Sequence, residues 1–156
     1  MSSWLTDART EFIARLQANA HLAATIRTWI TFGSGLQQRL IIEPNLCPLC
    51  CVSPHEGAMD QRYNVLAEYP QKLQIDLATA EPDQDPAPLE ELLTEGIYRV
   101  VQEACADDLG LAADGCKGVF CEGTNWIARA DKEAARLIWI ATTTVRIGWI
   151  RTQPHA

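Results

Sequence analysis

The spacing of apolar residues predicts a helix at the start of the chain. Six of them recur at intervals of one, three and four positions: Trp4, Leu5, Ala8, Phe12, Ile13 and Leu16. Such intervals place side chains on one face of a helix, and polar residues such as Asp7 and Glu11 fall mostly on the other side. We therefore expect a helix over residues 4–19, within an N-terminal helical segment 1–24, with Ser3 as its cap.

β-branched and aromatic residues then replace the helical pattern. The run 25–32 is rich in them, Gly33, Ser34 and Gly35 follow, and 36–42 is again apolar. Two strand-like runs around a short glycine-containing connection predict a β-hairpin. A helix that continues through residues 23–26 is the competing interpretation.

The next apolar run, 46–52, contains a proline. Since proline has no N–H for the ladder, Pro48 favours an edge strand or a strand that begins near Leu49. Residues 53–64 hold Pro54, Gly57 and many polar side chains, which is typical of a loop.

The clearest strand pattern follows this loop. Leu73, Ile75 and Leu77 alternate with polar residues, namely Lys72, Gln74 and Asp76. Strict alternation predicts a half-buried strand with its polar side chains facing water.

A second helix is predicted over residues 88–107. Its apolar residues recur at helical spacing: Leu89, Leu92, Leu93, Ile97, Val100, Val101 and Ala104. Gly96 weakens a helix by about 1 kcal/mol relative to alanine, unless close packing requires a small residue there.

Two long strand-like runs close the chain. Residues 117–127 and 135–150 predict a hairpin whose charged tip lies near 128–133, and 151–156 is expected to be a mobile tail. Two main helices against a mostly antiparallel sheet make a two-layer α+β domain, and 156 residues suit one such domain, 1–156.

Composition excludes several function classes. With 20 acidic and 13 basic residues the net charge is −7, which argues against a protein that binds nucleic acid through a broad basic face. No apolar stretch approaches the roughly 20 residues that span a bilayer, and the N-terminus lacks the apolar core of a signal peptide. We therefore expect no membrane partner and no sequence-specific nucleic-acid binding.

The cysteines and acidic residues offer only weak candidate chemistry. Cys47 and Cys50 form a CxxC motif, but a structural zinc site needs four converging ligands and no second such motif follows. We therefore expect no metal, and keep a zinc-binding adaptor as the alternative of another class. A thiol nucleophile would have only His55 as a reasonable base, and the acids Glu81, Asp83 and Asp85 lack the glycine of a calcium loop. The sequence thus predicts no cofactor, no catalytic residues and no enzyme.

Several segments together resemble a known family. After the run 44–54 comes the segment 69–77, which begins with Tyr69 and Pro70, then the helix 89–104 and the hairpin 118–150. This order resembles the tail-terminator proteins of long-tailed bacteriophages, the minor tail protein U type. Neck and head-completion proteins, and baseplate or tail tube components, are the related alternatives.

The resemblance implies a structural role in a virion. Members form a ring, expected here to be a homohexamer, that caps the tail tube and joins it to the head connector while genome DNA passes through. Assembly in the host bacterial cytoplasm and a final place in the tail or neck follow from it. Subunit and tube contacts are expected on the loops 56–68, 81–88 and 128–134, with these candidate interface residues: Glu81, Asp83, Asp85, Arg129, Asp131, Lys132 and Glu133.

Overall fold

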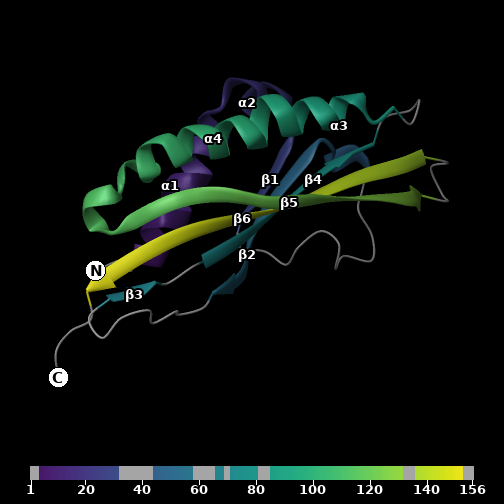
Figure 1. Cartoon of the computed structure of the whole chain (residues 1–156). Helices are drawn as coiled ribbons and strands as arrows, with labels where there is room; N and C mark the ends of the chain where they lie inside the picture. The colour runs from purple at the N-terminus through teal and green to yellow at the C-terminus, as the bar shows by residue number, and fades with distance from the viewer. Residues whose placement is uncertain are drawn as a thin grey trace.

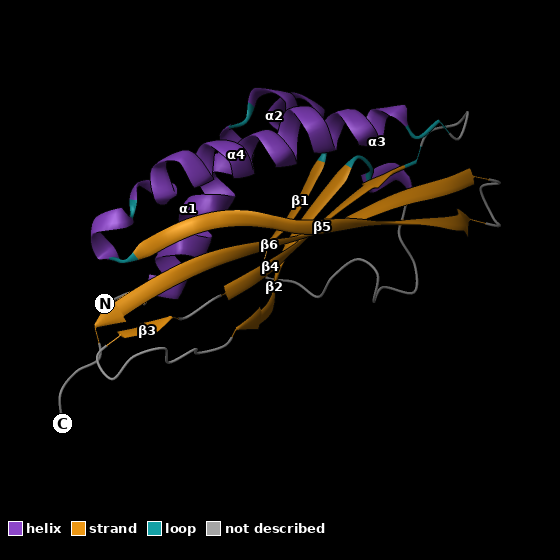
Figure 2. Ribbon diagram, in the orientation of Figure 1, coloured by secondary structure: helices purple, strands orange, loops and turns teal. Residues whose placement is uncertain are grey.

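A computed structural model describes residues 4–31, 44–57, 66–68, 71–80, 85–131 and 136–152. The chain is an α+β protein in two layers, with helices over one face of a six-stranded sheet (Figures 1 and 2). The sheet comprises β1 (Thr28–Thr31), β2 (Leu49–Gly57), β3 (Leu66–Glu68), β4 (Gln71–Thr79), β5 (Cys116–Asp131) and β6 (Arg136–Thr152). The strand order is β1-β2-β4-β6-β3. β5 also pairs with β6, along the side of β6 that does not contact β4. Every pairing is antiparallel except that of β1 with β2, which confirms the fold class expected from the sequence.

The N-terminal helical pattern resolves into two helices. α1 (Trp4–Ala18) ends where Asn19 leaves the helical conformation, and α2 (Ala20–Thr25) begins there. The Asn19 side chain accepts a hydrogen bond from the Leu22 backbone N–H at 2.9 Å, so it caps the second helix. The continuing helix was thus the better interpretation of residues 23–25, and the strand predicted from residue 25 begins only at Thr28.

β1 has a partner, β2, that the sequence did not predict. β1 pairs in parallel with β2, from Thr28 opposite Leu49 to Thr31 opposite Val52, and the expected hairpin partner 36–42 lies outside the described residues. β2 begins at Leu49 as expected, but it lies between β1 and β4, so the edge-strand alternative is wrong. It also continues to Gly57 through a register shift between Pro54 and Glu56, which corrects the start of the predicted loop.

The second predicted helix is one continuous helical run in three parts. α3 (Ala87–Glu91) leads into a π-helical segment (Leu92–Ile97) and then into α4 (Tyr98–Asp107). A Cβ atom at Gly96 would lie 2.5 Å from Cδ2 of Leu22 in α2. Close helix packing therefore requires glycine at this position.

The main core fills the space between the helices and the sheet. Phe12, Leu16 and Leu22 of the helices meet the apolar side of β4 and the fully buried Trp149 of β6. A smaller cluster lies on the opposite face of the sheet: Cys47, Leu49, Cys51, Ala78, Ile138 and Ile140.

Asp76 corrects the simple alternation predicted for β4. Its side chain is fully buried rather than facing water. Its two carboxylate oxygens accept hydrogen bonds from the Thr142 hydroxyl at 2.5 Å and from the Gln74 amide at 2.9 Å. Part of the second face of the sheet is therefore also covered and internally hydrogen-bonded.

The closing hairpin is longer than predicted at both ends. Residues 128–131 continue β5, where a loop tip was expected, and residues 151–152 belong to β6 and pair with β3. The rest of the predicted tip and tail, 132–135 and 153–156, lies outside the described residues.

A tight connection leads from α4 into β5. It contains two short 3-10 helices (Asp108–Gly110 and Ala112–Asp114) and ends at Gly115, whose φ is +114°. The Gly115 carbonyl accepts a hydrogen bond from the Ile150 N–H at 2.9 Å, which fixes the start of β5 against the end of β6.

Candidate assembly interface

The longest exposed feature of the sheet is the outer edge of β5. This strand pairs with β6 along its whole length, from Cys116 opposite Trp149 to Asp131 opposite Arg136. No strand among the described residues pairs with its other side, which runs along the margin of the sheet in Figures 1 and 2. An unpaired edge offers backbone N–H and C=O groups to another chain.

Two bulges divide this edge into unlike halves. Register shifts occur between Cys116 and Val119 and between Cys121 and Gly123, and this first half also carries the charged Lys117 and Glu122. From Gly123 to Asp131 the ladder with β6 is unbroken. Because bulges protect edges from pairing, we define the regular edge as the part of β5 without a register shift, residues 123–131.

The regular edge carries exposed apolar side chains. Trp126 is 41% exposed on the helix side of the sheet and lies edge-on against Trp139, with ring centroids 6.5 Å apart. Ile127 is half-buried on the opposite face. A large aromatic side chain beside an open edge is typical of a protein–protein contact.

Hydrogen bonds hold this part of β5 in place. The Tyr98 hydroxyl of α4 lies 2.6 Å from the Thr124 hydroxyl, which in turn lies 3.0 Å from that of Thr143 in β6. The helix layer is thus connected to the regular edge, which makes the edge a preorganised surface.

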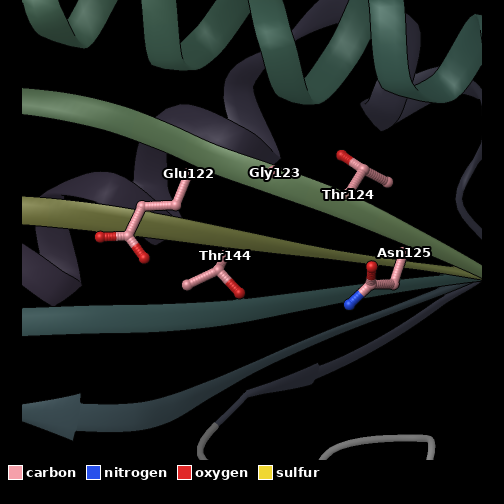
Figure 3. Close-up of a pocket in the computed structure, with 5 residues that line it drawn as sticks. All are labelled: Glu122, Gly123, Thr124, Asn125 and Thr144. Atoms are coloured by element: carbon pink, nitrogen blue, oxygen red, sulfur yellow. The ribbon is translucent and has the colours of Figure 1, made fainter.

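An open depression marks the junction between the two halves (Figure 3). It has a volume of about 310 Å³ and is lined by Glu122, Gly123, Thr124, Asn125 and Thr144. Apart from Gly123 itself and its two chain neighbours, no described residue has an atom within 4 Å of the place where a Cβ of Gly123 would be. Glu122 forms an ion pair with Lys72 at 3.1 Å. Its lining offers hydroxyl, amide and carboxylate groups, which can hydrogen-bond a docked side chain or loop.

The interface residues expected from the sequence are only partly described. Glu81, Asp83, Lys132 and Glu133 lie outside the described residues. Asp85 is exposed, and its carboxylate accepts a hydrogen bond from the Ala87 N–H at 3.0 Å at the start of α3. Arg129 and Asp131 occupy positions in β5, not in a loop, opposite Ile138 and Arg136.

Sequence reasoning missed the regular edge itself. The sequence predicts a strand over residues 117–127, but no local signal says that this strand lacks a second neighbour. The available signal was the stretch Thr124, Asn125, Trp126, Ile127 and Ala128, which holds no charged residue to protect an edge.

The two candidate zinc ligands do not face each other. Cys50 belongs to the main core, whereas Cys47 belongs to the cluster on the opposite face of the sheet. Burial raises the pKa of the Cys47 thiol to about 11, and burial also raises the pKa of Cys50. Zinc binds the thiolate, so neither position favours a metal. Among the described residues, no three His, Cys, Asp or Glu side chains are grouped to hold a metal ion.

Two of the six thiols should react rapidly with a thiol reagent at neutral pH. Cys105 and Cys121 are exposed, while Cys47, Cys50, Cys51 and Cys116 are buried. Burial also raises the pKa of the Cys116 thiol to about 11, so only a very small fraction of this side chain is thiolate at pH 7. Alkylation followed by peptide mass spectrometry measures the rate at which each thiol reacts. Unfolded protein, in which all six thiols should react, is the control. Equal rates for Cys47 and Cys105 in the folded protein would contradict the buried arrangement.

The net charge is confined to one part of the molecule. Residues 85–114, which form the long helical run and the connection after it, hold eight of the 20 acidic residues and one of the 13 basic residues. The remaining twelve acidic and twelve basic residues cancel. The charge of −7 therefore belongs to this helical run, and all but one of its acidic side chains are exposed.

Comparison with known proteins gives a distant likeness to solved structures. No family model matches the sequence, and no curated protein matches it. A solved structure described as "Virion of native gene transfer agent (GTA) particle" contains a similar chain, with 17% identity and a TM-score of 0.47. The match covers 90% of this chain and 93% of that one. A likeness this distant carries no inference about function. Among the described residues, no helix is long and apolar enough to cross a membrane.

Proposed function

We propose that this chain is a structural subunit of a phage-like virion, and within it a tail terminator. In this role copies of the chain form a ring, expected to contain six, that caps the tail tube and joins it to the head connector. The subunit acts through surfaces alone, without a cofactor and without catalysis. Its partners are further copies of itself, the tube protein and the connector.

The regular edge of β5 is the observation that carries this proposal. It combines an unbroken row of backbone groups with the exposed Trp126, and no described strand covers it. A monomer that left such an edge open would be prone to uncontrolled pairing, because its chemistry is that of an unfinished sheet. A subunit that is always covered by a neighbour in an assembly has no such problem. The element order that resembles tail terminators gives the assembly its identity.

No specific observation favours the neck-protein alternative or the zinc-adaptor alternative. The opposite placement of Cys47 and Cys50 removes the feature on which the adaptor rested. A protein of the neck would use the same edge, so the tail tube itself has to be part of the test.

Purified protein should form rings, alone or on the ends of tail tubes. Mass photometry should give a species of about six times the 17.3 kDa chain, and negative-stain images should show rings or capped tube ends. Ala128→Lys places a charge on the regular edge and should leave monomers, because a lysine protects a strand edge from pairing. Ala23→Lys makes the same change at an exposed alanine of α2 and should assemble normally.

The proposal fails if the unmodified protein remains a monomer at every concentration and also ignores tube ends. If rings form but never bind tubes, the ring survives and the terminator role does not.

A further inference from the structure

The two outer strands of the sheet carry the same dipeptide. β1 contains Trp29 and Ile30, and the regular edge of β5 contains Trp126 and Ile127. β1 pairs only with β2 among the described strands, so its other side, like that of β5, has no described partner.

Each dipeptide presents its side chains in the same way. Trp29 lies opposite Cys50, and Trp126 lies opposite Ala141, so both tryptophans are on the helix side of the sheet. Ile30 lies opposite Cys51, and Ile127 opposite Ile140, so both isoleucines are on the other side. None of the four is fully buried, and no strand of the described part of the chain lies beside either outer edge.

We propose that β5 of one copy pairs edge to edge with β1 of the next copy, so that the sheets of neighbouring subunits join into one. This inference rests on the ring subunit proposed above and goes further by naming the two surfaces that meet. The occupant of the regular edge is thus the β1 strand of a second copy of this chain.

The strand directions fit this arrangement. Across the sheet, β1 and β2 run one way, β4 the other, β6 the first way again and β5 opposite to it. β5 therefore runs antiparallel to β1. When two copies lie side by side with their helices on the same face, the new pair is antiparallel, and antiparallel pairs are slightly more stable per residue than parallel ones.

The unlike edges also explain a ring. A contact between two different surfaces of the same chain is head-to-tail, and it closes into a ring when the rotation between copies permits. Pairing of β5 with β5 would instead be self-complementary and would stop at two copies. Tryptophan beside tryptophan on one face, and isoleucine near isoleucine on the other, gives the contact its register.

That register makes a specific prediction. With Trp126 opposite Trp29, Ile127 lies opposite Thr28 of the neighbouring copy, and both side chains are on the face away from the helices. Directly opposed residues in an antiparallel pair have Cβ atoms about 4.5–5.5 Å apart. A disulfide needs a Cβ–Cβ distance of about 3.5–4.5 Å, so a small adjustment of the strands lets two cysteines at these positions form one without strain.

Disulfide cross-linking tests the pairing. The exposed Cys105 and Cys121 are first changed to serine, and Thr28→Cys and Ile127→Cys are then made in separate chains. Circular dichroism checks the fold and mass photometry the assembly before oxidation. A mixture of the two variants should give disulfide-linked dimers, each variant alone should not, and one chain with both changes should give a ladder of covalent oligomers. Thr28→Cys with Ala128→Cys is the matched control, because Ala128 is one residue along the strand on the opposite face.

Each of the other outcomes contradicts a specific part of the proposal. Cross-linking of Ile127→Cys with itself, or equal cross-linking of the control pair, overturns the pairing of β5 with β1. Rings that assemble without any cross-link also overturn it, while the ring remains. Absence of all assembly overturns the ring together with the pairing.

Discussion

Trp149→Ala should destabilise the protein by about 3–5 kcal/mol, the usual cost of removing a large aromatic side chain from a core. Trp149 is fully buried among the helix-facing residues of the sheet, and of the described side chains that are fully buried it is the largest. Its removal leaves a cavity that the long strands on either side cannot easily close. Urea denaturation followed by circular dichroism measures the lost free energy of unfolding.

Trp126→Ala is the matched control for this change. The same atoms are removed from the same hairpin, but Trp126 is 41% exposed, so the cost to the folded monomer should be below about 1.5 kcal/mol. Assembly should respond in the reverse order, because only Trp126 lies on the regular edge. Similar losses of stability for both variants would contradict the difference in burial between Trp149 and Trp126 described above.

Gly115→Ala should cost about 3 kcal/mol. Its φ of +114° is a conformation that residues with a side chain rarely adopt, and such strain costs of order 1–3 kcal/mol. In addition, a Cβ there would lie 2.6 Å from the Ile150 backbone oxygen and 2.8 Å from Nε1 of Trp149. Because a backbone atom cannot move aside as a side-chain end can, the start of β5 would have to shift away from β6.

Gly110→Ala separates conformational strain from this clash. Gly110 also has a positive φ, +69°, but the nearest atom to its added Cβ is Arg15 Nη2 at 3.8 Å. Its cost should be about 1–2 kcal/mol, the ordinary cost of the left-handed conformation. Thermal or urea unfolding of both variants gives the comparison, and equal losses would mean that the contact with β6 is not close.

The periodic parts of the fold were predictable because one sequence feature determined each of them. Leu73, Ile75 and Leu77 alternate, and they form β4; the leucines after Pro88 recur at helical spacing, and they form the long helical run. The prediction that Asp76 faces water was wrong, because alternation says only that the two faces of a strand differ. Whether the second face meets water depends on what packs against it, which involves residues far away in the sequence.

The candidate interface was less predictable for a related reason. The sequence indicates that residues 117–127 form a strand, but an edge is a property of the whole sheet order. The tryptophans illustrate this point: no local sequence feature says that Trp149 is fully buried whereas Trp126 is 41% exposed. β1 was harder still, because its parallel partner β2 is separated from it by residues 32–48.

The confinement of the acidic excess to the helical run makes the molecule strongly dipolar. If subunits join through their sheet edges, every helix layer lies on the same side of the wall, and the wall has one charged surface and one that is electrically balanced. Counterions then accumulate on the charged surface, within a layer about 10 Å thick at 0.1 M salt. Ionic strength should thus act mainly on the curvature of the wall and on what approaches its helical side. The central contact of each seam, residues 124–127 of β5 against 28–31 of β1, is uncharged and should be almost insensitive to it.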